Sequence, residues 1–233
     1  MTQSLDGLLT ALHEERVRTW DPAKLKINVD QRRELVDAFD PAGVVQAGDT
    51  LPPFALRDVE GETITRETLA GTPAVLIFFR FAGCPVCNIA LPHYDRALRP
   101  KLSSAGVPLI AISPQVPERL VEIKRAHGLK LTVASDPGNA LARRLGITYE
   151  ANAATKQNSS GPGWIGEATG TGTWELPQPT ALVIDGTARV LFAEVCPDWL
   201  KRTEAHTIAH AVDDALARDG AAPPPPPVAE VIG

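Results

Sequence analysis

The sequence contains little cysteine, few aromatic residues and no excess of basic charge. Its 233 residues include three cysteines, 5% aromatic residues and a formal net charge of -5. An odd, low number of cysteines in a chain of this size excludes a scaffold held together by disulfides. The acidic balance argues against a nucleic-acid partner bound through a basic face, and so few aromatic residues argue against a base-stacking surface. The hydrophobic content of 44% is enough for a normal core.

Long apolar runs are absent as well. No stretch approaches the ~20 apolar residues that a membrane-spanning helix needs, so no membrane partner is expected. The first residues, MTQSLDGLLTALHEERV, are amphipathic and lack the basic start and apolar run of a secretory signal. The sequence therefore predicts a cytoplasmic protein. In that reducing compartment, a close pair of cysteines more often performs chemistry or binds metal than forms a structural disulfide.

Hydrophobic spacing divides the chain into three parts. Leucines recur at helical intervals from residue 5 and predict an amphipathic helix over residues 4–18. A second short helix is expected from Leu35 to Phe39. Residues 1–43 are thus predicted to be an N-terminal helical extension, which could pack on the main domain or mediate homodimerisation. The main domain is predicted to cover residues 44–218, and the proline-rich tail 219–233 is expected to be extended or disordered.

Within the main domain, apolar runs alternate with helical patterns. Hairpins are expected at 54–65 and 180–195, further strands at 73–79, 107–113 and 131–134, and helices at 84–101, 117–127, 136–145 and 203–218. Residues 150–177 interrupt this alternation because they are rich in glycine, serine, threonine and asparagine, and they predict a long loop close to the reactive centre. The order predicts an α/β domain with a mainly parallel sheet, to which the last hairpin adds antiparallel strands.

The segment GCPVCN places Cys84 and Cys87 at the start of a predicted helix, directly after the most apolar strand. Unpaired N–H groups and the helix dipole at that end stabilise a thiolate, which is the nucleophile in disulfide exchange and in attack on a peroxide. Two intervening residues allow the sulfurs to close a disulfide ring, and Pro85 suits a first helical turn. Two other readings are a pair of inert buried thiols and a zinc site, although zinc usually needs four ligands.

Two prolines add a resemblance to thioredoxin. Pro92 follows Cys87 by five residues, where the active-site helix of thioredoxin also carries a proline. Pro179, just before a late strand, resembles the cis-proline that lies against the dithiol in thioredoxin-like proteins. That resemblance implies a cis peptide bond before Pro179 and makes Pro179 a candidate site residue.

A broader resemblance covers residues 44–200. The runs VVQAGDTLPPFALRDVEGETITRETLAGTPAVLIFFRFAGCPVC, VPLIAISPQ and ASDPGNALARRLGI are similar to peroxiredoxins of the alkyl hydroperoxide reductase/thiol-specific antioxidant (AhpC/TSA) family, and most similar to its Cys-x-x-Cys branch. The resemblance implies a thioredoxin-like fold with peroxiredoxin-type additions and thiol-dependent antioxidant activity without a cofactor. The chain departs from the family in two places: where peroxiredoxins carry a Thr or Ser three residues before the peroxidatic cysteine, Cys84 precedes Cys87, and Pro179 stands where they carry an arginine. Phe78 stands where thioredoxin has a buried aspartate.

Arg80 lies four residues before Cys84, and the resembling branch also carries arginine there. A guanidinium at that position would lower the pKa of the thiols and could orient a peroxide, whereas the alternative is an ordinary surface ion pair.

Other candidates are weaker. Cys196 could resolve an oxidised Cys87, although a lone cysteine is more often a small buried hydrophobe. His206 and His210 are four residues apart on a predicted helix but lack a third ligand, which favours a solvated face. Asp136 and Arg143 suit capping and surface roles.

Three functions remain open from the sequence. The first is an antioxidant enzyme in which Cys87 attacks a hydroperoxide and Cys84 condenses with the resulting sulfenic acid, after which an external thiol such as a thioredoxin or a low-molecular-weight thiol reduces the disulfide. The second is a dithiol–disulfide oxidoreductase in which Cys84 attacks a disulfide and Cys87 resolves the mixed disulfide. The third is a non-catalytic redox sensor or binding module. The flanking sequence favours the first, with Cys87 as the peroxide-reactive sulfur.

Overall fold

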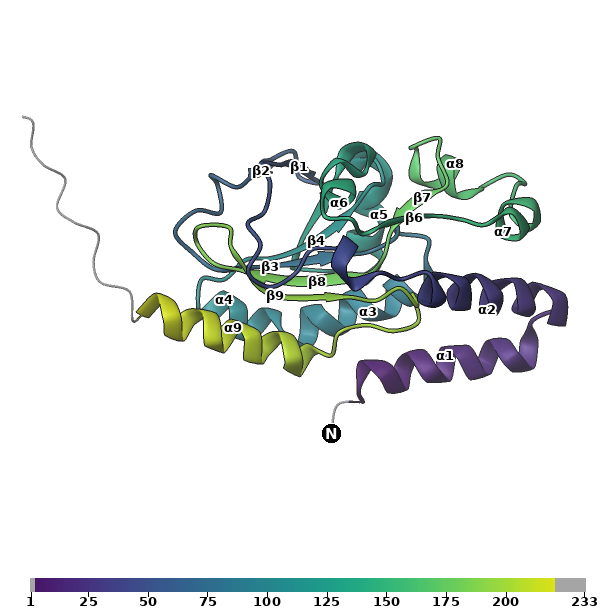
Figure 1. Ribbon diagram of the computed structural model, residues 1–233, viewed down its shortest axis with the longest axis horizontal. Coiled ribbons are helices and arrows are strands. Elements are labelled where there is room, and N and C mark those ends of the chain that lie inside the picture. The colour runs from purple at the N-terminus through teal and green to yellow at the C-terminus, as the bar shows by residue number, and fades with distance from the viewer. Residues whose placement is uncertain (1–2, 221–233) are drawn as a thin grey trace, which may run out of the picture.

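The computed structural model describes residues 3–220, and a seven-stranded sheet runs through its centre (Figure 1). The strand order is β2-β1-β5-β4-β3-β8-β9. The strands are β1 (Ala55–Asp58), β2 (Thr63–Thr65), β3 (Ala74–Phe78), β4 (Leu109–Ser113), β5 (Thr132–Ser135), β8 (Thr180–Ile184) and β9 (Val190–Val195). Only the pairings β3–β4 and β4–β5 are parallel. The expectation of a mainly parallel sheet is therefore wrong, because the first hairpin also joins the sheet antiparallel, through β5.

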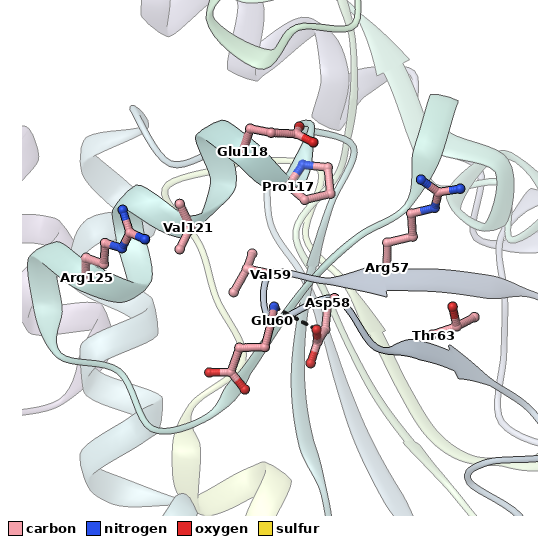
Figure 2. Close-up of a pocket in the computed structure, with 10 residues that line it drawn as sticks. Arg57, Asp58, Val59, Glu60, Thr63, Pro117, Glu118, Val121 and Arg125 are labelled. Carbon is pink, nitrogen blue, oxygen red and sulfur yellow. Dashed lines mark hydrogen bonds between the residues drawn. The ribbon is translucent and has the colours of Figure 1, made fainter.

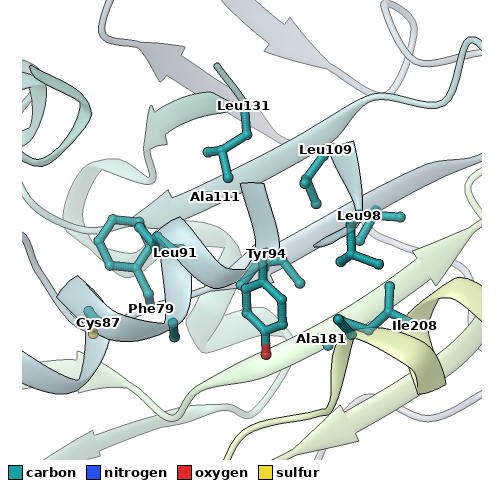
Figure 3. Close-up of a cluster of buried hydrophobic side chains, with 14 of the residues drawn as sticks. Phe79, Cys87, Leu91, Tyr94, Leu98, Leu109, Ala111, Leu131, Ala181 and Ile208 are labelled. Carbon is teal, nitrogen blue, oxygen red and sulfur yellow. The ribbon is translucent and has the colours of Figure 1, made fainter. Parts of the chain in front are cut away.

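Strand β3 is buried on both faces and divides the core in two. Val75 and Ile77 face one hydrophobic cluster, which also contains both helix-borne cysteines. Leu76 and Phe78 face a second cluster on the opposite side, as the two-residue period of a strand requires. Figure 3 shows part of the first cluster, with Cys87 at its margin. The dithiol thus begins where the central strand ends, against packed core.

Helices cover both faces of the sheet. They are α3 (Pro85–Ala97), α4 (Arg99–Ser104), α5 (Pro117–His127), α6 (Ala140–Arg144) and α9 (Ala205–Gly220). The helix expected over 84–101 is divided after Ala97, and Pro100 occupies the first turn of α4, where a missing N–H costs least. Pro92 lies inside α3. The helix expected over 136–145 starts only at Ala140, with Asn139 at its N-cap position. The carboxylate of Asp136 still accepts hydrogen bonds from the Leu141 and Ala142 amides at 2.9 Å and so caps α6 from four residues before its start.

Two N-terminal helices, α1 (Leu5–Thr19) and α2 (Pro22–Asp37), are followed by the short 3₁₀ helix η1 (Pro41–Gly43). The second is much longer than the helix expected from Leu35 to Phe39, because Asp21 caps it: its side chain accepts from the amides of Ala23 and Lys24, and Pro22 starts the helix. Helix α1 packs on α3, with Leu5 and Leu9 buried in the cluster that holds the cysteines. Between residues 3 and 220, no helix combines the length and apolar character needed to cross a membrane.

The segment 150–177 is not the long loop expected from its composition. It contains α7 (Ala153–Asn158), α8 (Ile165–Thr169) and β7 (Glu175–Pro177), while the 3₁₀ helix η2 (Pro137–Asn139) and β6 (Thr148–Glu150) precede it. Strands β6 and β7 pair antiparallel, and the rings of Trp164 and Trp174 pack with centroids 4.9 Å apart. Strand pairing and ring packing with residues distant in sequence therefore give regular structure to a polar segment that has no clear hydrophobic period. Apart from the last two residues of α9, the tail expected over 219–233 lies outside the described residues.

Candidate active site

The two cysteines occupy the first turn of α3. Cys84 is the N-cap of the helix, Pro85 begins it, and Cys87 follows three residues after the cap. Side chains from two other places hold the loop before the helix. The amide of Asn88 donates to the carbonyls of Ala82 and Cys84 at 2.6 and 2.9 Å. The side-chain oxygen of Gln115 accepts from the Ala82 amide at 2.7 Å. The loop that presents Cys84 is therefore fixed in place.

Both sulfurs are free thiols and both are buried. Cys84 exposes 1% of its surface and Cys87 none. Burial in an apolar core penalises the thiolate of either cysteine, so a reactive thiol here needs specific compensation. Two arginines lie close enough to the sulfurs to compensate for this penalty.

Each sulfur has its own arginine. Nη1 of Arg80 lies 3.9 Å from Sγ of Cys84, and Nη2 of Arg202 lies 3.9 Å from Sγ of Cys87. Arg80 stacks on the ring of Trp199, with its guanidinium carbon 4.4 Å from the ring centroid. Arg202 donates to the carbonyls of Trp199 and Lys201. Both cations are thus held against the dithiol by the turn that follows β9.

A third arginine comes from the N-terminal extension. Arg16 of α1 exposes only 5% of its surface and stacks over Trp20, its guanidinium carbon 4.8 Å from the ring centroid. Burial lowers the pKa of Arg16, while the nearby Cys84 opposes that shift. Helix α1 therefore adds positive charge within electrostatic reach of Cys84.

The pKa values of the two thiols are shifted in opposite directions. The hydrogen bond from the Cys87 thiol lowers the pKa of Cys84 well below its usual range, and the charges of Arg80 and Arg202 act in the same direction against the penalty of burial. Burial raises the pKa of Cys87, and its hydrogen bond to Cys84 raises it further. These directions favour ionisation of Cys84 over ionisation of Cys87. This order favours Cys84 as the attacking sulfur, whereas the sequence favoured Cys87 for peroxide attack.

Pro179 lies in a different setting from the one expected. None of the peptide bonds within residues 3–220 is cis, so the expected cis bond before Pro179 is wrong. The Pro179 carbonyl accepts a hydrogen bond from the amide of Cys196 at 2.8 Å. Pro179 also lines, with Cys196 and Arg202, a small hollow between β8 and α3. It thus lies next to the arginine that serves Cys87.

Cys196 is buried just after β9, and burial raises its pKa to about 11. That acidity agrees with a small hydrophobic side chain and disfavours a thiolate. His206 and His210 are exposed on α9, and no group of three metal-ligating side chains occurs within the described part of the chain. Arg143 forms an ion pair with Glu175 at the surface.

A large hollow lies on another part of the molecule, and neither cysteine is among its walls. It measures about 740 Å³ and lies between the β1–β2 hairpin and α5. Figure 2 shows Arg57 and Arg125 on its walls together with Asp58, Glu60 and Glu118. Neither cysteine lines it. The hollow is therefore separate from the dithiol.

Sequence reasoning identified Arg80 but missed Arg16, Trp199 and Arg202. Arg80 belongs to the same local segment as Cys84, so its proximity could be inferred. Arg202 meets a sulfur 115 positions earlier in the chain. No motif in the sequence marks that contact or the burial of Arg16.

Comparison with known proteins gives this site a family. Residues 47–193 match the family model described as the AhpC/TSA family. The chain is 28% identical over 106 residues to peroxiredoxin Bcp of Escherichia coli (strain K12), covering 46% of this chain and 67% of that protein. It is 29% identical over 103 residues to chloroplastic peroxiredoxin Q of Sedum lineare, covering 44% of this chain and 55% of that protein. The chain thus spans about half to two thirds of the length of the curated relatives that it matches.

Solved structures agree on the fold. Peroxidoxin BcpB from Mycobacterium tuberculosis superposes with a TM-score of 0.55 at 21% identity, covering 77% of this chain and 99% of that one. AhpC from Enterococcus faecalis superposes with a TM-score of 0.59 at 13% identity, covering 78% and 99%. These neighbours confirm the expected thioredoxin-like fold of peroxiredoxin type. Because the matched family region includes both cysteines and more than half of the residues, the chain belongs to the AhpC/TSA family.

Proposed function

We propose that the protein is a thiol-dependent antioxidant oxidoreductase that reduces hydroperoxides through a Cys84/Cys87 dithiol–disulfide cycle. Membership of the AhpC/TSA family supports this class of chemistry. The observation that carries the proposal is the geometry of the pair: Cys84 caps α3 with Nη1 of Arg80 3.9 Å from its sulfur, and Cys87 follows one turn later with Nη2 of Arg202 3.9 Å from its sulfur. The lowered pKa of Cys84 and the raised pKa of Cys87 agree with this arrangement. A peroxidatic cycle needs one thiolate to attack and one thiol to resolve.

In the proposed cycle the Cys84 thiolate attacks the terminal oxygen of a hydroperoxide. An S–O bond forms as the O–O bond breaks, and the alkoxide takes up a proton and leaves as an alcohol. Cys87 then loses its proton, and its sulfur displaces the hydroxyl of the Cys84 sulfenic acid, which leaves as water. The disulfide is reduced by two electrons from an external thiol such as a thioredoxin or a low-molecular-weight thiol. Arg202, beside Cys87, favours the deprotonation that the resolving step needs.

This proposal assigns first attack to Cys84, whereas the flanking sequence favoured Cys87. The reason is that Cys84 caps the helix and accepts the hydrogen bond from the Cys87 thiol, which lowers the pKa of Cys84, whereas burial and the same hydrogen bond raise the pKa of Cys87. Only the thiolate form of a cysteine is an effective nucleophile.

The same electrostatics support a second candidate, a dithiol–disulfide oxidoreductase. There, too, Cys84 attacks first, and Cys87 resolves a mixed disulfide with a protein or a small molecule. The two candidates differ in the bond that is broken, O–O or S–S, and not in the sulfur that attacks. In either case we propose a cytoplasmic location, because such a cycle depends on a reducing thiol pool.

Stopped-flow mixing of the reduced protein with hydrogen peroxide, alongside an insulin-disulfide reduction assay, tests the proposal. Rapid oxidation with loss of two thiols is expected, and peptide mapping should find a Cys84–Cys87 disulfide. After a brief peroxide pulse, Cys87→Ser should carry a sulfenic acid on Cys84, and Cys84→Ser should carry little on Cys87. Slow oxidation by peroxide together with fast reduction of insulin would favour the disulfide reductase over the peroxidase. A sulfenic acid found only on Cys87 would reverse the assignment of the attacking sulfur.

A further inference from the structure

The loop before Cys84 is held at Ala82 by two side-chain amides, those of Gln115 and Asn88, which we call the amide clamp. The backbone amide of Ala82 donates to the side-chain oxygen of Gln115 at 2.7 Å. The carbonyl of Ala82 accepts from Nδ2 of Asn88 at 2.6 Å, and the same Nδ2 donates to the carbonyl of Cys84 at 2.9 Å. The clamp thus occupies both backbone groups of Ala82 and reaches the residue that carries the attacking sulfur.

Each amide of the clamp is oriented by a further contact. Gln115 is buried, and its Nε2 donates to the carbonyl of Ala168 in α8 at 3.3 Å. Oδ1 of Asn88 lies 2.6 Å from Nε2 of His127, the last residue of α5. Because Nδ2 of Asn88 faces two carbonyl oxygens, its Oδ1 must be the atom that faces His127, and an amide oxygen can only accept. Nε2 of His127 therefore carries a proton and donates it.

The position of Cys84 determines how strongly its surroundings act on its sulfur. Nη1 of Arg80 lies 3.9 Å from Sγ of Cys84, and the attraction between a cation and a thiolate falls with distance. Cys84 is also the N-cap of α3, and the positive end of a helix acts only within its first turn. Charges held in place stabilise an anion better than charges that must first be ordered. Side chains that fix the backbone of Cys84 therefore influence its reactivity.

We propose that His127 is a positioning residue of the dithiol site, which acts through Asn88 to hold the backbone of Cys84. This contact keeps the sulfur of Cys84 beside Arg80. The inference rests on the proposed function for the choice of Cys84 as the attacking sulfur. Asn88 directly follows Cys87 in the segment GCPVCN, so the short motif that carries the reactive sulfurs also carries the link to α5. His127 is exposed and lies 39 positions after Asn88, on a separate helix.

Two neutral substitutions at position 127 separate the hydrogen bond from the ring and its charge. In His127→Gln a side-chain N–H lies about as far from the backbone as Nε2 did, whereas in His127→Asn it lies one methylene nearer and cannot reach Asn88. His206→Ala, on the exposed side of α9, is the control. The pH dependence of iodoacetamide alkylation, in a Cys87→Ser background, reports the acidity of Cys84.

We expect His127→Asn to move the alkylation midpoint upward and to lower the ratio of thiolate to thiol by about two- to tenfold, the effect of losing one hydrogen bond. His127→Gln and His206→Ala should match the parent. Coincident profiles for His127→Asn and His127→Gln would overturn the proposal. A loss of stability alone would not move the midpoint of a protein that urea unfolding shows to be folded under the assay conditions.

The route through Asn88 is tested by combining substitutions. Asn88→Ala removes the clamp contacts on both carbonyls and should move the midpoint at least as far as His127→Asn does. Adding His127→Asn to Asn88→Ala should then change nothing further, because the two residues act as one unit. Additive shifts would show that His127 acts independently of Asn88 and would overturn the proposal. If Asn88→Ala does not fold, the comparison of glutamine with asparagine at the exposed position 127 decides alone.

Alkylation needs no peroxide, so the positioning role and the proposed function are tested separately. In the protein with both cysteines, stopped-flow oxidation by hydrogen peroxide should be slower in His127→Asn than in His127→Gln. A shifted alkylation profile in a protein that does not reduce peroxide would contradict the proposed function and leave the positioning role standing. Fast peroxide reduction together with coincident alkylation profiles would contradict the positioning role alone.

Discussion

The Arg80 side chain and backbone are held by more contacts than those of an exposed arginine. Its guanidinium carbon lies 4.4 Å from the centroid of the Trp199 ring and its Nη1 3.9 Å from Sγ of Cys84, and the rings of Tyr149 and Trp199 stack with centroids 5.9 Å apart. The hydroxyl of Ser113 donates to the Arg80 carbonyl at 3.0 Å and fixes the backbone at the end of β3. A cation immobilised in this way acts on the thiolate without first having to be ordered.

Replacement of Arg80 by glutamine should therefore raise the pKa of Cys84. The folded pKa of Cys84 is lowered, so its thiolate persists until the pH falls through that lowered value, and loss of the cation moves the transition upward. A rise of one pKa unit would lower the ratio of thiolate to thiol about tenfold at any given pH and move the midpoint of the alkylation profile up by about one pH unit. The pH dependence of iodoacetamide alkylation, followed in a Cys87→Ser background where a hydroxyl can still donate to Cys84, measures the change.

The matched control is Arg143→Gln, which removes an exposed arginine paired with Glu175. Its alkylation profile should coincide with that of the Cys87→Ser parent. An unchanged profile in Arg80→Gln would mean that the helix end and the Cys87 position alone set the acidity of Cys84.

At the scale of residues, the sequence predicted the contacts between side chains that are close together in the chain. Cys84, Cys87 and Arg80 lie within one strand–turn–helix unit, so a short segment contains all the information needed to bring them together. Arg16 and Arg202 approach the sulfurs from the two ends of the chain, and only the packing of α1 and of the turn after β9 decides that. The sequence could not predict the trans bond before Pro179 either, because only the resemblance to thioredoxin had implied a cis bond there.

At the scale of elements, strong apolar periodicity predicted the strands well. The strands at 74–78, 109–113 and 180–184 lie within their expected ranges because each is a run of apolar residues buried on both faces. The interior of α2 is polar and the segment 150–177 has no clear hydrophobic period, so apolar spacing could not predict their helices. Side-chain caps set where these helices begin. The Asn152 side chain, for example, accepts from the Thr155 amide at 2.9 Å and starts α7.

The attachment of α1 depends on its buried leucines. Leu9 is buried against the dithiol cluster, whereas Val17 on the same helix is 55% exposed. Leu9→Ala should lower the free energy of unfolding by about 2–5 kcal/mol, because it removes buried methyl groups and leaves a cavity. Val17→Ala should change it by less than about 0.5 kcal/mol. Urea denaturation of the reduced proteins measures both, and equal effects of the two variants would argue that α1 does not pack on the core in solution.

The turn after β9 should report the redox state. Trp199 contacts Arg80, which in turn contacts the ionised sulfur, while Trp174 packs on Trp164 at a separate place. Oxidation to the disulfide removes the thiolate charge and changes the field at Trp199. A variant that retains only Trp199 should therefore change its emission on oxidation, and a variant that retains only Trp174 should change less. A larger response from Trp174 would place the conformational change in the 150–177 segment instead.

At the scale of the whole molecule, the site is assembled from parts inside and outside the family region. The family match covers residues 47–193, which include the strand, the dithiol and Pro179. Helices α1 and α2 precede it, and Trp199 and Arg202 follow it. These two flanks meet each other: the amides of Leu5 and Asp6 donate to the carboxylate of Glu204 at 3.2 and 2.8 Å. The flanks thus close over the dithiol as one unit.

The flanks are also joined by a largely buried ion pair. Nη1 of Arg32 on α2 lies 3.0 Å from the carboxylate of Asp198, and the two side chains are 10% and 23% exposed. The same carboxylate accepts from the amide of Leu200 at 2.8 Å, so it also shapes the turn that holds Trp199 and Arg202. Removing one partner of a largely buried pair leaves the other charge without compensation.

Asp198→Asn should therefore destabilise the protein by about 1–3 kcal/mol, since a buried donor loses its charged acceptor. Arg32→Gln should cost a similar amount alone but less when combined with Asp198→Asn, giving a coupling energy within about 0.5–3 kcal/mol. Asp213→Asn is the control, because Asp213 pairs with Lys101 where both side chains are about half exposed, and such pairs contribute about 0–1 kcal/mol. Urea unfolding of the four proteins of the cycle measures the coupling. Additive effects of the two substitutions would show that the flanks are held by the helix–core contacts alone and that the turn carrying Arg202 keeps its shape without α2.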